Sequence, residues 1–406
     1  MYGFLIRCYG ALLALAARFH PKARLWHEGR RNWRARYRAA FPPEPARPVL
    51  WIHAASLGEF EQGRPVLEAW RARHPEYRIV LSFFSPSGYE IRKNYSGADF
   101  ICYLPLDTAR NARDFVEIIQ PEVAIFVKYE FWHNYLKVLK NNNIKTLLIS
   151  SVFRPEQVFF KPWGAFWRKM LHAFTHIYVQ DERSVQLLQS INITVVTRAG
   201  DTRIDRVLEN AQQAHVLPEG VVIQVDLVVG SSWPADEALL LPLLVKHGWR
   251  AIIAPHEPAE GHLQALEKAL PAGSSVRLSK LHAGNAHLPY VLVDGIGQLN
   301  RLYRYGRVAY IGGGFGKGIH NTLEPAAYGL PVLFGPKYHK FEEARQLSAL
   351  GGFFPVQDSA TLEKQLKTLL GPGDARERAA AIVLQWLEEN KGATEQVLNG
   401  INTQAG

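Results

Sequence analysis

Short apolar runs alternate with longer segments of mixed polarity along most of the chain. Such runs, separated by segments with helical periodicity, are typical of parallel strands joined by helical crossovers. In the first half we therefore predict strands at residues 49–53, 78–84, 100–104, 123–127, 144–149 and 177–179. Helices are predicted between them at residues 87–95, 111–119 and 131–139.

The alternation lapses once, around residues 205–218, where the chain becomes a polar helical connector. It resumes with strands predicted at residues 227–229, 250–253, 290–293, 308–311, 332–334 and 353–355, followed by a long helix at 377–389. A chain of 406 residues is long enough for two domains of this kind. We therefore predict two doubly wound α/β domains, at residues 41–205 and 206–385.

The first 40 residues differ in composition from the rest. Residues 1–17 are apolar except for Arg7, and eight basic residues follow: Arg18, Lys22, Arg24, Arg30, Arg31, Arg34, Arg36 and Arg38. Because positive charges placed after an apolar run oppose export, this order favours an interfacial helix with a basic collar on anionic lipid. A buried helix with a solvated basic face is the alternative. The run is short for a bilayer span, and whether it spans the membrane or lies on it stays open.

The formal charge of +10 indicates an anionic partner, that is, a phosphate, a nucleic acid or a membrane surface. No nucleic-acid-binding motif is visible in the sequence. The two cysteines, Cys8 and Cys102, argue against a disulfide framework and against a cysteine metal site.

Ligands of doubly wound sheets bind at the carboxyl ends of the strands, so the loops after the strands are the candidate sites. After the first strand, Ser56 and Gly58 permit a tight turn and Glu59 stands at the start of a helix. Glu59 suits a general base, but a glutamate there also stabilises the helix dipole, and position alone leaves both open. Glu130 is a second acid at an equivalent strand end, and pairing with Lys128 is its structural interpretation.

In the second half, a glycine loop at residues 312–316 leads to His320, Asn321 and Glu324 at the start of a short helix, 323–328. Glycines let a backbone come close to a ligand, and a helix N-terminus capped by Asn321 suits a phosphate. Glu324 would accept hydrogen bonds from sugar hydroxyls. Further candidate groups follow the other strands: Ser231, Ser232, His256, Ile296 and Gly297. The set predicts a nucleotide-sugar site, and a tight βα connection without a ligand is the alternative.

Four segments carry a resemblance to a known family. Residues 53–59 (HAASLGE) resemble the HxVSxGE stretch of the 3-deoxy-D-manno-octulosonic acid (Kdo) transferases specific for lipid A, glycosyltransferase family 30. Residues 128–134 (KYEFWHN) are similar to the family's xTExWPN segment, and residues 200–205 (GDTRID) to its GxxKxD segment. Residues 320–327 (HNTLEPAA) resemble HNPLEPA, the most specific of the four. The resemblance covers nearly the whole chain in matching order, although Thr322 replaces the usual proline and Arg203 the usual lysine.

The resemblance implies a GT-B fold, in which two Rossmann-like domains face each other across a cleft. It implies that residues 386–406 return toward the N-terminal domain. It also implies an inverting transfer of Kdo from CMP-Kdo to the lipid A precursor, lipid IVA, without a metal or other cofactor. The enzyme would act at the cytoplasmic face of the inner membrane, with residues 1–40 on the anionic lipid surface.

The resemblance also assigns expected roles to individual residues. Glu59 falls at the family's general base. The acceptor side would include Ser56, Gly58, Glu130 and Arg203. The donor side would include Ser231, Ser232, His256, Ile296, Gly297, Gly313, His320, Asn321 and Glu324.

Three other interpretations stay open. A sugar-nucleotide epimerase would share the fold and the donor-side glutamate, and lipid A disaccharide synthase would use a UDP sugar. A basic nucleic-acid-binding protein would explain the charge but not the acids and glycines at the strand ends. The number of Kdo residues transferred, the acyl pattern of the acceptor and the oligomeric state do not follow from the sequence.

Overall fold

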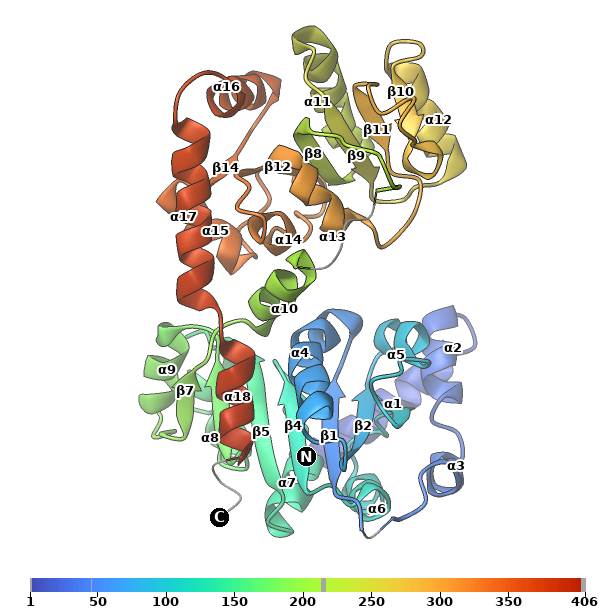
Figure 1. Ribbon diagram of the computed structural model, residues 1–406. Helices are drawn as coiled ribbons and strands as arrows, with labels where there is room; N and C mark the ends of the chain where they lie inside the picture. The colour runs from blue at the N-terminus through green and yellow to red at the C-terminus, as the bar shows by residue number, and fades with distance from the viewer. Residues whose placement is uncertain (1, 45, 213–216, 403–406) are drawn as a thin grey trace. The chain divides into compact units, whose positions relative to one another are not determined.

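Two β-sheets of seven strands each organise the computed structural model, which describes residues 2–44, 46–212 and 217–402 (Figure 1). One sheet belongs to a unit formed by Met1–Asp205 and Lys391–Gly406, the other to a unit formed by Arg206–Asn390. The division after Asp205 falls where the sequence analysis places the domain junction. The predicted connector, residues 205–218, overlaps α10 (Thr202–Ala211), and its residues 213–216 lie outside the described part.

The first sheet contains β1 (Val49–Ala54), β2 (Arg78–Phe83), β3 (Phe100–Tyr103), β4 (Val123–Val127), β5 (Lys145–Ser151), β6 (His176–Val179) and β7 (Val196–Arg198). Its strand order is β3-β2-β1-β4-β5-β6-β7, and neighbouring strands are parallel. The helices between them are α4 (Leu57–Arg73), α5 (Pro86–Arg92), α6 (Ala109–Ile119), α7 (His133–Asn141), η1 (Val158–Phe160), α8 (Ala165–Leu171) and α9 (Glu182–Gln189).

Both faces of the first sheet are buried. Successive side chains of a strand point to opposite faces. In β1, Trp51 therefore enters one apolar cluster, whereas Leu50 and Ile52 enter another. A strand buried on both faces reads as a continuous apolar run, which is why this sheet could be predicted from the sequence.

The second sheet contains β8 (Val225–Ser232), β9 (Ala251–Pro255), β10 (Ser275–Arg277), β11 (Tyr290–Leu292), β12 (Gly306–Ile311), β13 (Val332–Phe334) and β14 (Phe353–Pro355). Its order is β10-β11-β9-β8-β12-β13-β14, again parallel. Its helices are α11 (Pro234–His247), α12 (Glu260–Ala269), η2 (Leu278–Lys280), α13 (Leu299–Leu302), η3 (Tyr303–Tyr305), α14 (Leu323–Ala326), α15 (Glu342–Leu350), α16 (Ser359–Leu370) and α17 (Ala375–Asn390).

The predicted strands are all present, and two further strands were missed. β7 and β10 have three residues each and lie at the edges of their sheets. An edge strand is covered less than a central one, so it needs no continuous apolar run. Neither VTR in β7 nor SVR in β10 has one.

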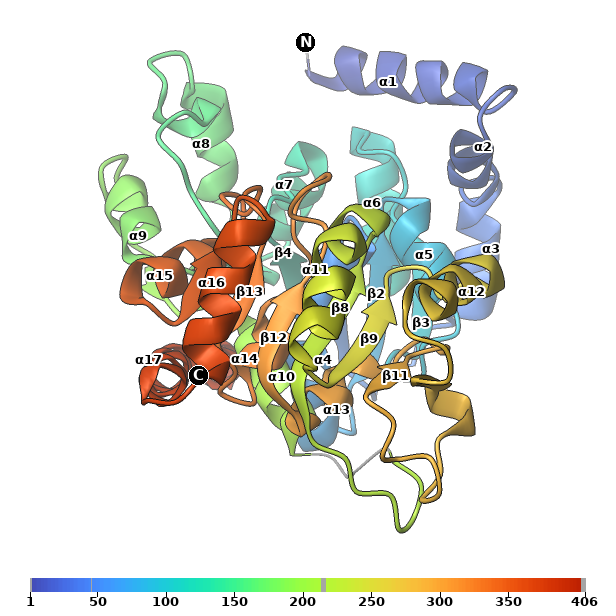
Figure 2. The same ribbon diagram turned by 90° about the horizontal axis from the view of Figure 1, so that it is seen from above.

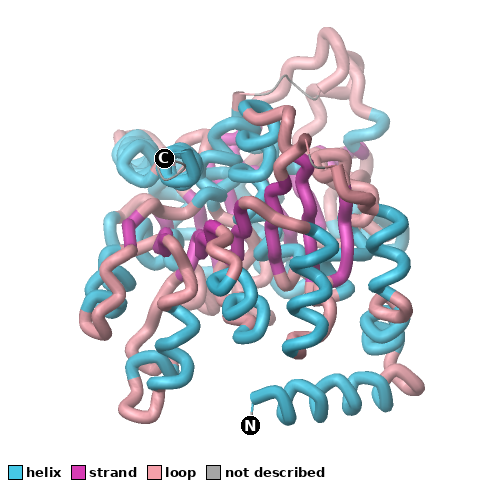
Figure 3. The backbone as a smooth tube through the Cα atoms, turned by 90° about the horizontal axis from the view of Figure 1, so that it is seen from below, coloured by secondary structure: helices cyan, strands magenta, loops and turns pink. Residues whose placement is uncertain are grey.

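α1 (Tyr2–Ala16) runs along the outside of the first unit and buries none of its residues (Figures 2 and 3). The Tyr2 hydroxyl fixes its start by donating to Oδ2 of Asp107 at 2.5 Å. The alternative of a buried N-terminal helix is therefore wrong for α1. Within the described ranges, no helix is both long and apolar enough to cross a membrane.

The basic collar predicted after α1 is only partly correct. α2 (Pro21–Glu28) and α3 (Trp33–Ala40) follow α1, and two of the predicted collar arginines, Arg30 and Arg34, are only partly exposed. Arg30 donates to the carbonyl of Phe84 at 2.7 Å, and Arg34 donates to Oδ2 of Asp114 at 2.5 Å. The exposed basic residues of this region are Arg7, Arg18, Lys22, Arg24, Arg31, Arg36 and Arg38.

The chain returns to the first unit at its end. α18 (Ala393–Asn402) packs on α4 and adds four side chains to the apolar cluster there: Ala393, Val397, Leu398 and Ile401. The Asp205 carboxylate accepts hydrogen bonds from the backbone nitrogens of Gly392 and Thr394, at 2.6 and 2.7 Å. The return begins at Lys391, five residues later than the 386 expected from the resemblance.

Gly230→Ala is expected to destabilise the second unit. A Cβ at this position would lie 2.1 Å from the hydroxyl oxygen of Tyr303, a fully buried side chain that cannot move aside. Overpacking of this kind costs about 1–3 kcal/mol, so the midpoint of thermal unfolding, followed by circular dichroism, should fall. Gly261→Ala is the control, because a Cβ at Gly261 in α12 meets nothing within 4 Å. Equal midpoints for the two variants would contradict this account.

Candidate functional site

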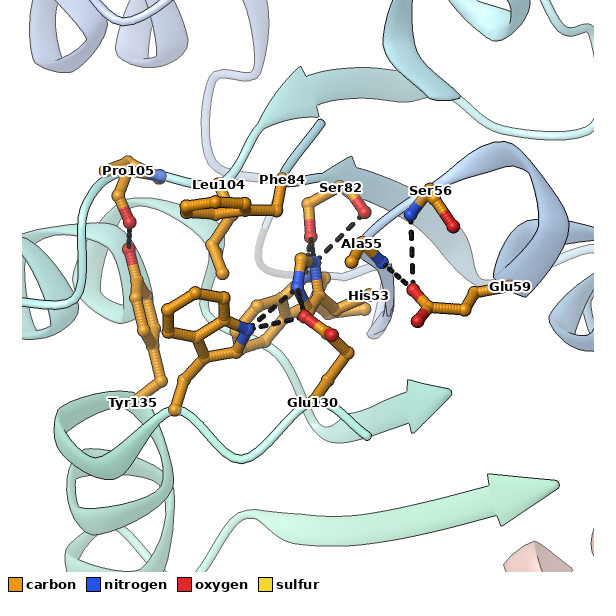
Figure 4. Close-up of polar contacts among 12 residues, drawn as sticks. His53, Ala55, Ser56, Glu59, Ser82, Phe84, Leu104, Pro105, Glu130 and Tyr135 are labelled. Atoms are coloured by element: carbon orange, nitrogen blue, oxygen red, sulfur yellow. Dashed lines mark hydrogen bonds and ion pairs between the residues drawn. The ribbon is translucent and has the colours of Figure 1, made fainter. Parts of the chain in front are cut away.

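Glu59 lies in the first turn of α4, just after the carboxyl end of β1. Its Oε2 accepts hydrogen bonds from the backbone nitrogens of Ala55 and Ser56, at 2.6 and 3.2 Å (Figure 4). Its Oε1 has no hydrogen-bond partner among the described residues. Glu59 therefore caps the helix with one oxygen, and the other oxygen is free to accept a proton.

The turn before Glu59 differs from the prediction. α4 begins at Leu57 rather than near Glu59, with Ser56 as the extended N-cap residue, so Gly58 lies inside the first helical turn. A Cβ at Gly58 would meet no atom within 4 Å. The turn therefore lies at Ala55 and Ser56 and does not include Gly58, where the backbone does not require a glycine.

The electrostatic environment favours the protonated form of Glu59. Burial raises its pKa above the ordinary value, and the negative charge of Glu130 raises it further. Hydrogen bonds from Ala55 and Ser56 and the nearby His53 oppose the increase without cancelling it. A carboxylate with a raised pKa is a stronger base, which suits proton abstraction near neutral pH.

Glu130 follows β4 and is buried in a hydrogen-bond network (Figure 4). Its Oε2 lies 2.8 Å from Nε2 of His53 and accepts a hydrogen bond from Nε1 of Trp132 at 2.6 Å. Nδ1 of His53 lies 2.9 Å from Oγ of Ser82. The carbonyl oxygen of Ser82 also lies 3.1 Å from Nδ1, so both ring nitrogens of the buried His53 have hydrogen-bond partners.

This network corrects one interpretation and adds a residue. The carboxylate of Glu130 is hydrogen-bonded to His53 and Trp132, not to Lys128 as the sequence suggested. His53 itself is fully buried and was not predicted as a site residue. A histidine at the end of an apolar strand was the available signal, because a fully buried imidazole needs a polar partner.

Arg203 is tied to its own neighbour. Its Nε and Nη2 donate to Oδ2 of Asp201 at 2.9 and 2.6 Å, an arrangement that neutralises both charges. Burial alone would raise the pKa of Asp201, but the positive charges of Arg203 and Lys128 hold it below the ordinary value. The pair of Arg203 and Asp201 therefore orders the start of α10. At the same place, the side-chain hydroxyl of Thr202 donates to the backbone carbonyl of Gln62 in α4.

In the second unit, three strand-end loops bring three rings together. Trp233 follows β8, His256 follows β9 and His320 follows β12. The ring of His256 stacks on Trp233 with centroids 4.6 Å apart and on His320 with centroids 4.3 Å apart. The sequence predicted both histidines as donor-side residues but missed Trp233, whose indole joins them.

Trp233 fixes the protonation state of His320. The indole Nε1 can only donate, and it lies 3.0 Å from Nε2 of His320. Nε2 must therefore be unprotonated, which places the proton of the neutral ring on Nδ1, where it has no partner among the described residues. Burial lowers the pKa of His320, and the neighbouring His256 lowers it further.

The glycine loop after β12 is packed against its own protein. A Cβ at Gly312 would lie 2.3 Å from the carbonyl oxygen of Ser231, and one at Gly314 would lie 2.6 Å from Cα of Gly335. Gly313 has φ +91°, and its backbone nitrogen donates to Oδ2 of Asp236 at 2.9 Å. Two of the glycines predicted to approach a ligand are thus required by close backbone contacts within the unit.

The helix after this loop is shorter than predicted. α14 ends at Ala326 instead of Tyr328, and its N-cap residue is Thr322, not Asn321. The Asn321 side chain instead accepts from the backbone nitrogen of Leu323 at 3.1 Å and donates to Oε1 of Glu324 at 3.0 Å. Asn321 and Glu324 are therefore brought together and orient each other.

The remaining donor-side residues divide into exposed and buried groups. Ile296 is 89% exposed, and Gly297 beside it has φ +84°, a conformation that favours glycine. Ser231 has φ +51° and is half-buried. Ser232 is fully buried and its hydroxyl donates to Oε1 of Glu237 at 2.7 Å, so it supports the loop from inside. Among the residues that the structure describes, no group of three or more His, Cys, Asp or Glu could hold a metal ion.

The sequence comparisons with known proteins name the same family in each case. Residues 31–206 match the family model described as 3-deoxy-D-manno-octulosonic-acid transferase (kdotransferase). The chain is 25% identical over 378 residues to the 3-deoxy-D-manno-octulosonic acid transferase of Haemophilus influenzae, covering 89% of this chain and 87% of that protein. It is 28% identical over 368 residues to the protein of the same name from Chlamydophila psittaci, covering 86% and 83%.

Solved structures of low sequence identity share the fold. A UDP-N-acetylglucosamine 2-epimerase superposes with a TM-score of 0.57 at 11% identity, over 89% of this chain and 98% of that one. The glycotransferase of kitacinnamycin gives a TM-score of 0.55 at 14% identity, over 89% and 100%. The predicted GT-B fold class, with two Rossmann-like units, is confirmed by these likenesses and by the two parallel sheets.

The stability of the second unit is expected to fall as the pH is lowered below about 6.5, the ordinary histidine pKa. Because the folded pKa of His320 is lowered, the unfolded chain binds its proton first, so acid favours unfolding. His256 opposes protonation of His320, and the nearby Asp236 favours it more weakly. The slope for one such group is at most about 1.4 kcal/mol per pH unit, measured by urea unfolding between pH 5.5 and 7.5.

His320→Gln should flatten this pH dependence, since glutamine does not titrate. His287→Gln is the matched control, because His287 is exposed and has no partner in the described part of the chain. An unchanged slope in His320→Gln would show that other groups cause the dependence.

Proposed function

The chain belongs to the family of 3-deoxy-D-manno-octulosonic acid (Kdo) transferases, glycosyltransferases of lipopolysaccharide biosynthesis, and we propose that it transfers Kdo from CMP-Kdo to a hydroxyl group of the lipid A precursor. The observation that supports this proposal is the state of Glu59. One of its oxygens is unpaired and its pKa is raised, at the carboxyl edge of a parallel sheet. A proton acceptor at that edge is what transfer to an alcohol requires.

In the proposed reaction, Oε1 of Glu59 takes the proton of the acceptor hydroxyl as its oxygen bonds to the anomeric carbon of Kdo. The bond from that carbon to the phosphate oxygen of CMP breaks, and CMP leaves with the electron pair. Attack from the face opposite the leaving group inverts the anomeric centre. The base is needed because a neutral alcohol is a poor nucleophile unless its proton is removed as the bond forms.

Glu130 would support this step without touching the proton. Its negative charge raises the pKa of Glu59. His53 and Trp132 keep Glu130 buried and fixed, so that its charge acts from a constant position. Ser56, which caps α4, and Arg203, held by Asp201, complete the proposed acceptor side.

The donor would bind at the carboxyl edge of the second sheet. The unpaired Nδ1–H of His320 can donate to a phosphate oxygen. Glu324, oriented by Asn321, can accept from hydroxyls of the ribose or of Kdo. His256 and Trp233 offer ring faces beside these groups, and the exposed Ile296 and Gly297 of the loop after β11 would border the donor.

Contact with the cytoplasmic face of the inner membrane is part of the proposal. Phe4, Leu12 and Leu15 of α1 are 70%, 65% and 54% exposed. Residues 4, 12 and 15 fall on one side of a helix. Trp163, at 74% exposure, precedes α8, and α8 meets α1 where Phe166 contacts Tyr2. These apolar side chains, with exposed basic residues nearby, suit an anionic lipid surface.

The direct test is transfer of Kdo by the purified protein. CMP-Kdo is generated in the assay, lipid A precursor is supplied, and the product is identified by mass spectrometry. Calorimetry with CMP and UDP shows which nucleotide the second unit prefers. Binding of UDP alone, with no transfer from CMP-Kdo, would favour another sugar-nucleotide enzyme.

Glu59→Gln is expected to lower the transfer rate by about 10²–10⁴-fold, since glutamine keeps the shape but cannot accept the proton. Affinity for CMP should be unchanged. In the wild type the rate should fall on the acid side as Glu59 becomes protonated, at a higher pH than an ordinary glutamate would give, because its pKa is raised. That limb should vanish from the residual activity of the variant.

Glu117→Gln is the control for loss of one negative charge in the same unit. Glu117 is exposed on α6 and has no partner among the described residues. Near-normal turnover by a folded Glu59→Gln protein would exclude Glu59 as the base and make Glu130 the next candidate.

Replacing Phe4, Leu12 and Leu15 together by serine should weaken binding to anionic vesicles by at least about tenfold. A large apolar side chain contributes roughly 1.5–3 kcal/mol when fully buried, and three would be lost. Sedimentation with vesicles measures the binding. Leu350→Ser removes a side chain of the second unit with 55% exposure and serves as the control. Vesicle binding that survives the triple substitution would mean that α1 does not contact the membrane through this face.

A further inference from the structure

A cavity of about 650 Å³ lies between α1, α2, α3 and the loop after β3. Its polar lining is mostly basic and comprises Arg7, His27, Arg30, Arg31, Asn32, Arg34 and Asn111. None of the described residues that line it is acidic. Positive charge gathered in a concave site raises the local concentration of anions, so the occupant should be an anion.

Arg30 forms a rigid part of the wall. Its Nε and Nη2 donate to the carbonyls of Leu104 and Phe84, at 2.8 and 2.7 Å. Its guanidinium carbon lies 4.0 Å above the centroid of the Trp26 ring. All of these partners are uncharged, so the positive charge of Arg30 is held in place without a carboxylate to balance it.

Two further arginines are available to a ligand. The side chains of Arg7 and Arg31 are exposed and make no hydrogen bond or ion pair with the described residues. Arg34 differs, because Asp114 accepts from its Nε and balances its charge. The cavity therefore offers three unbalanced guanidinium groups, one fixed and two free. A single guanidinium group can donate two parallel hydrogen bonds to the oxygens of one phosphate.

α1 contributes to the cavity and to the apolar surface at once. Arg7, Gly10 and Ala14 line the cavity and share one side of the helix by their spacing. The exposed apolar residues 4, 12 and 15 occupy a different side. Gly10 keeps α1 close to the loop, because a Cβ there would lie 2.6 Å from Cδ2 of Leu106.

We propose that this cavity binds the phosphate monoester group of an amphiphile whose acyl chains lie on the apolar side of α1, which rests on the membrane contact proposed above. A phosphate monoester carries a charge of about −1.5 to −2 at neutral pH, whereas a phosphodiester carries a single charge. Three arginines without a neighbouring carboxylate, gathered in one cavity, should therefore bind the monoester more tightly than the diester. A flat basic surface would not make this distinction.

Packed side chains connect the cavity wall to the network around Glu130. Phe84, whose carbonyl holds Arg30, packs on Trp132 with ring centroids 4.7 Å apart, and Trp132 donates to Glu130. Figure 4 labels Phe84, His53 and Glu130 among the residues of this region. The cavity and the proposed base therefore belong to the same unit, and packed side chains connect the cavity wall to Glu130.

The test uses the full chain and phosphatidylcholine vesicles that contain either phosphatidic acid, a monoester, or phosphatidylglycerol, a diester, adjusted to equal surface potential. Sedimentation should show tighter binding to phosphatidic acid. Arg31→Gln and Arg7→Gln should each reduce that preference by about tenfold, roughly the value of one charge-assisted contact. Arg38→Gln is the matched control, because Arg38 is exposed on α3 outside the cavity. Unchanged thermal midpoints establish that the variants are folded.

Equal affinity of the wild type for the two vesicles, or equal losses in Arg31→Gln and Arg38→Gln, would overturn the proposal. Glycerol 3-phosphate, a phosphate monoester without acyl chains, tests binding of the headgroup alone. Weak competition that Arg31→Gln abolishes supports the site, whereas binding as tight as that of vesicles would exclude a contribution from the acyl chains.

A transfer assay run on the same samples keeps this inference distinct from the proposed function. A wild type that prefers phosphatidic acid but transfers no Kdo contradicts the function and leaves the site standing. A wild type that transfers Kdo without any headgroup preference contradicts the site alone.

Discussion

Parallel strand pairing governs the arrangement of the functional groups. In the described part of the chain, each sheet is parallel throughout, so every carboxyl end lies along one edge. Crossover helices must then cover both faces, which accounts for the two apolar clusters on the first sheet. The same geometry places Glu59 and Glu130 at the carboxyl edge of the first sheet. It places Trp233, His256 and His320 at the carboxyl edge of the second sheet. Residues far apart in sequence meet there because the topology leaves their loops no other place.

Bringing two acidic side chains to one edge has an electrostatic cost. Two carboxylates at the edge of the first sheet repel each other, and burial disfavours both negative charges. The two carboxylates differ in the groups that donate hydrogen bonds to them. Glu130 receives hydrogen bonds from two buried rings, whereas Glu59 is bound through only one oxygen and retains a raised pKa. Because Glu59 keeps an oxygen without a hydrogen-bond partner among the described residues and its pKa is raised, we propose Glu59 rather than Glu130 as the base.

The sequence was sufficient for the two-domain α/β fold because most strands are buried on both faces and therefore visible as apolar runs. It was insufficient for β7 and β10, where edge position removes that signal. It located the strand-end residues but not their partners, since His53 and Glu130 are 77 positions apart. Arg30 and Arg31 look equivalent in the sequence, yet packing gives one to backbone carbonyls and leaves the other exposed. Local pattern predicts elements, whereas pairing over long separations follows only from the fold.

The position of α18 bears on how the protein is made. Its apolar residues complete the cluster around α4, the helix whose first turn holds Glu59. During synthesis, β1 to β7 emerge first, but α18, which packs on α4 and joins its apolar cluster, follows the whole of the second unit. Domains usually fold as the chain emerges. Here the apolar face of α4 is closed only by a segment that follows residues 206–390, so the first unit is completed after the second unit has been synthesised.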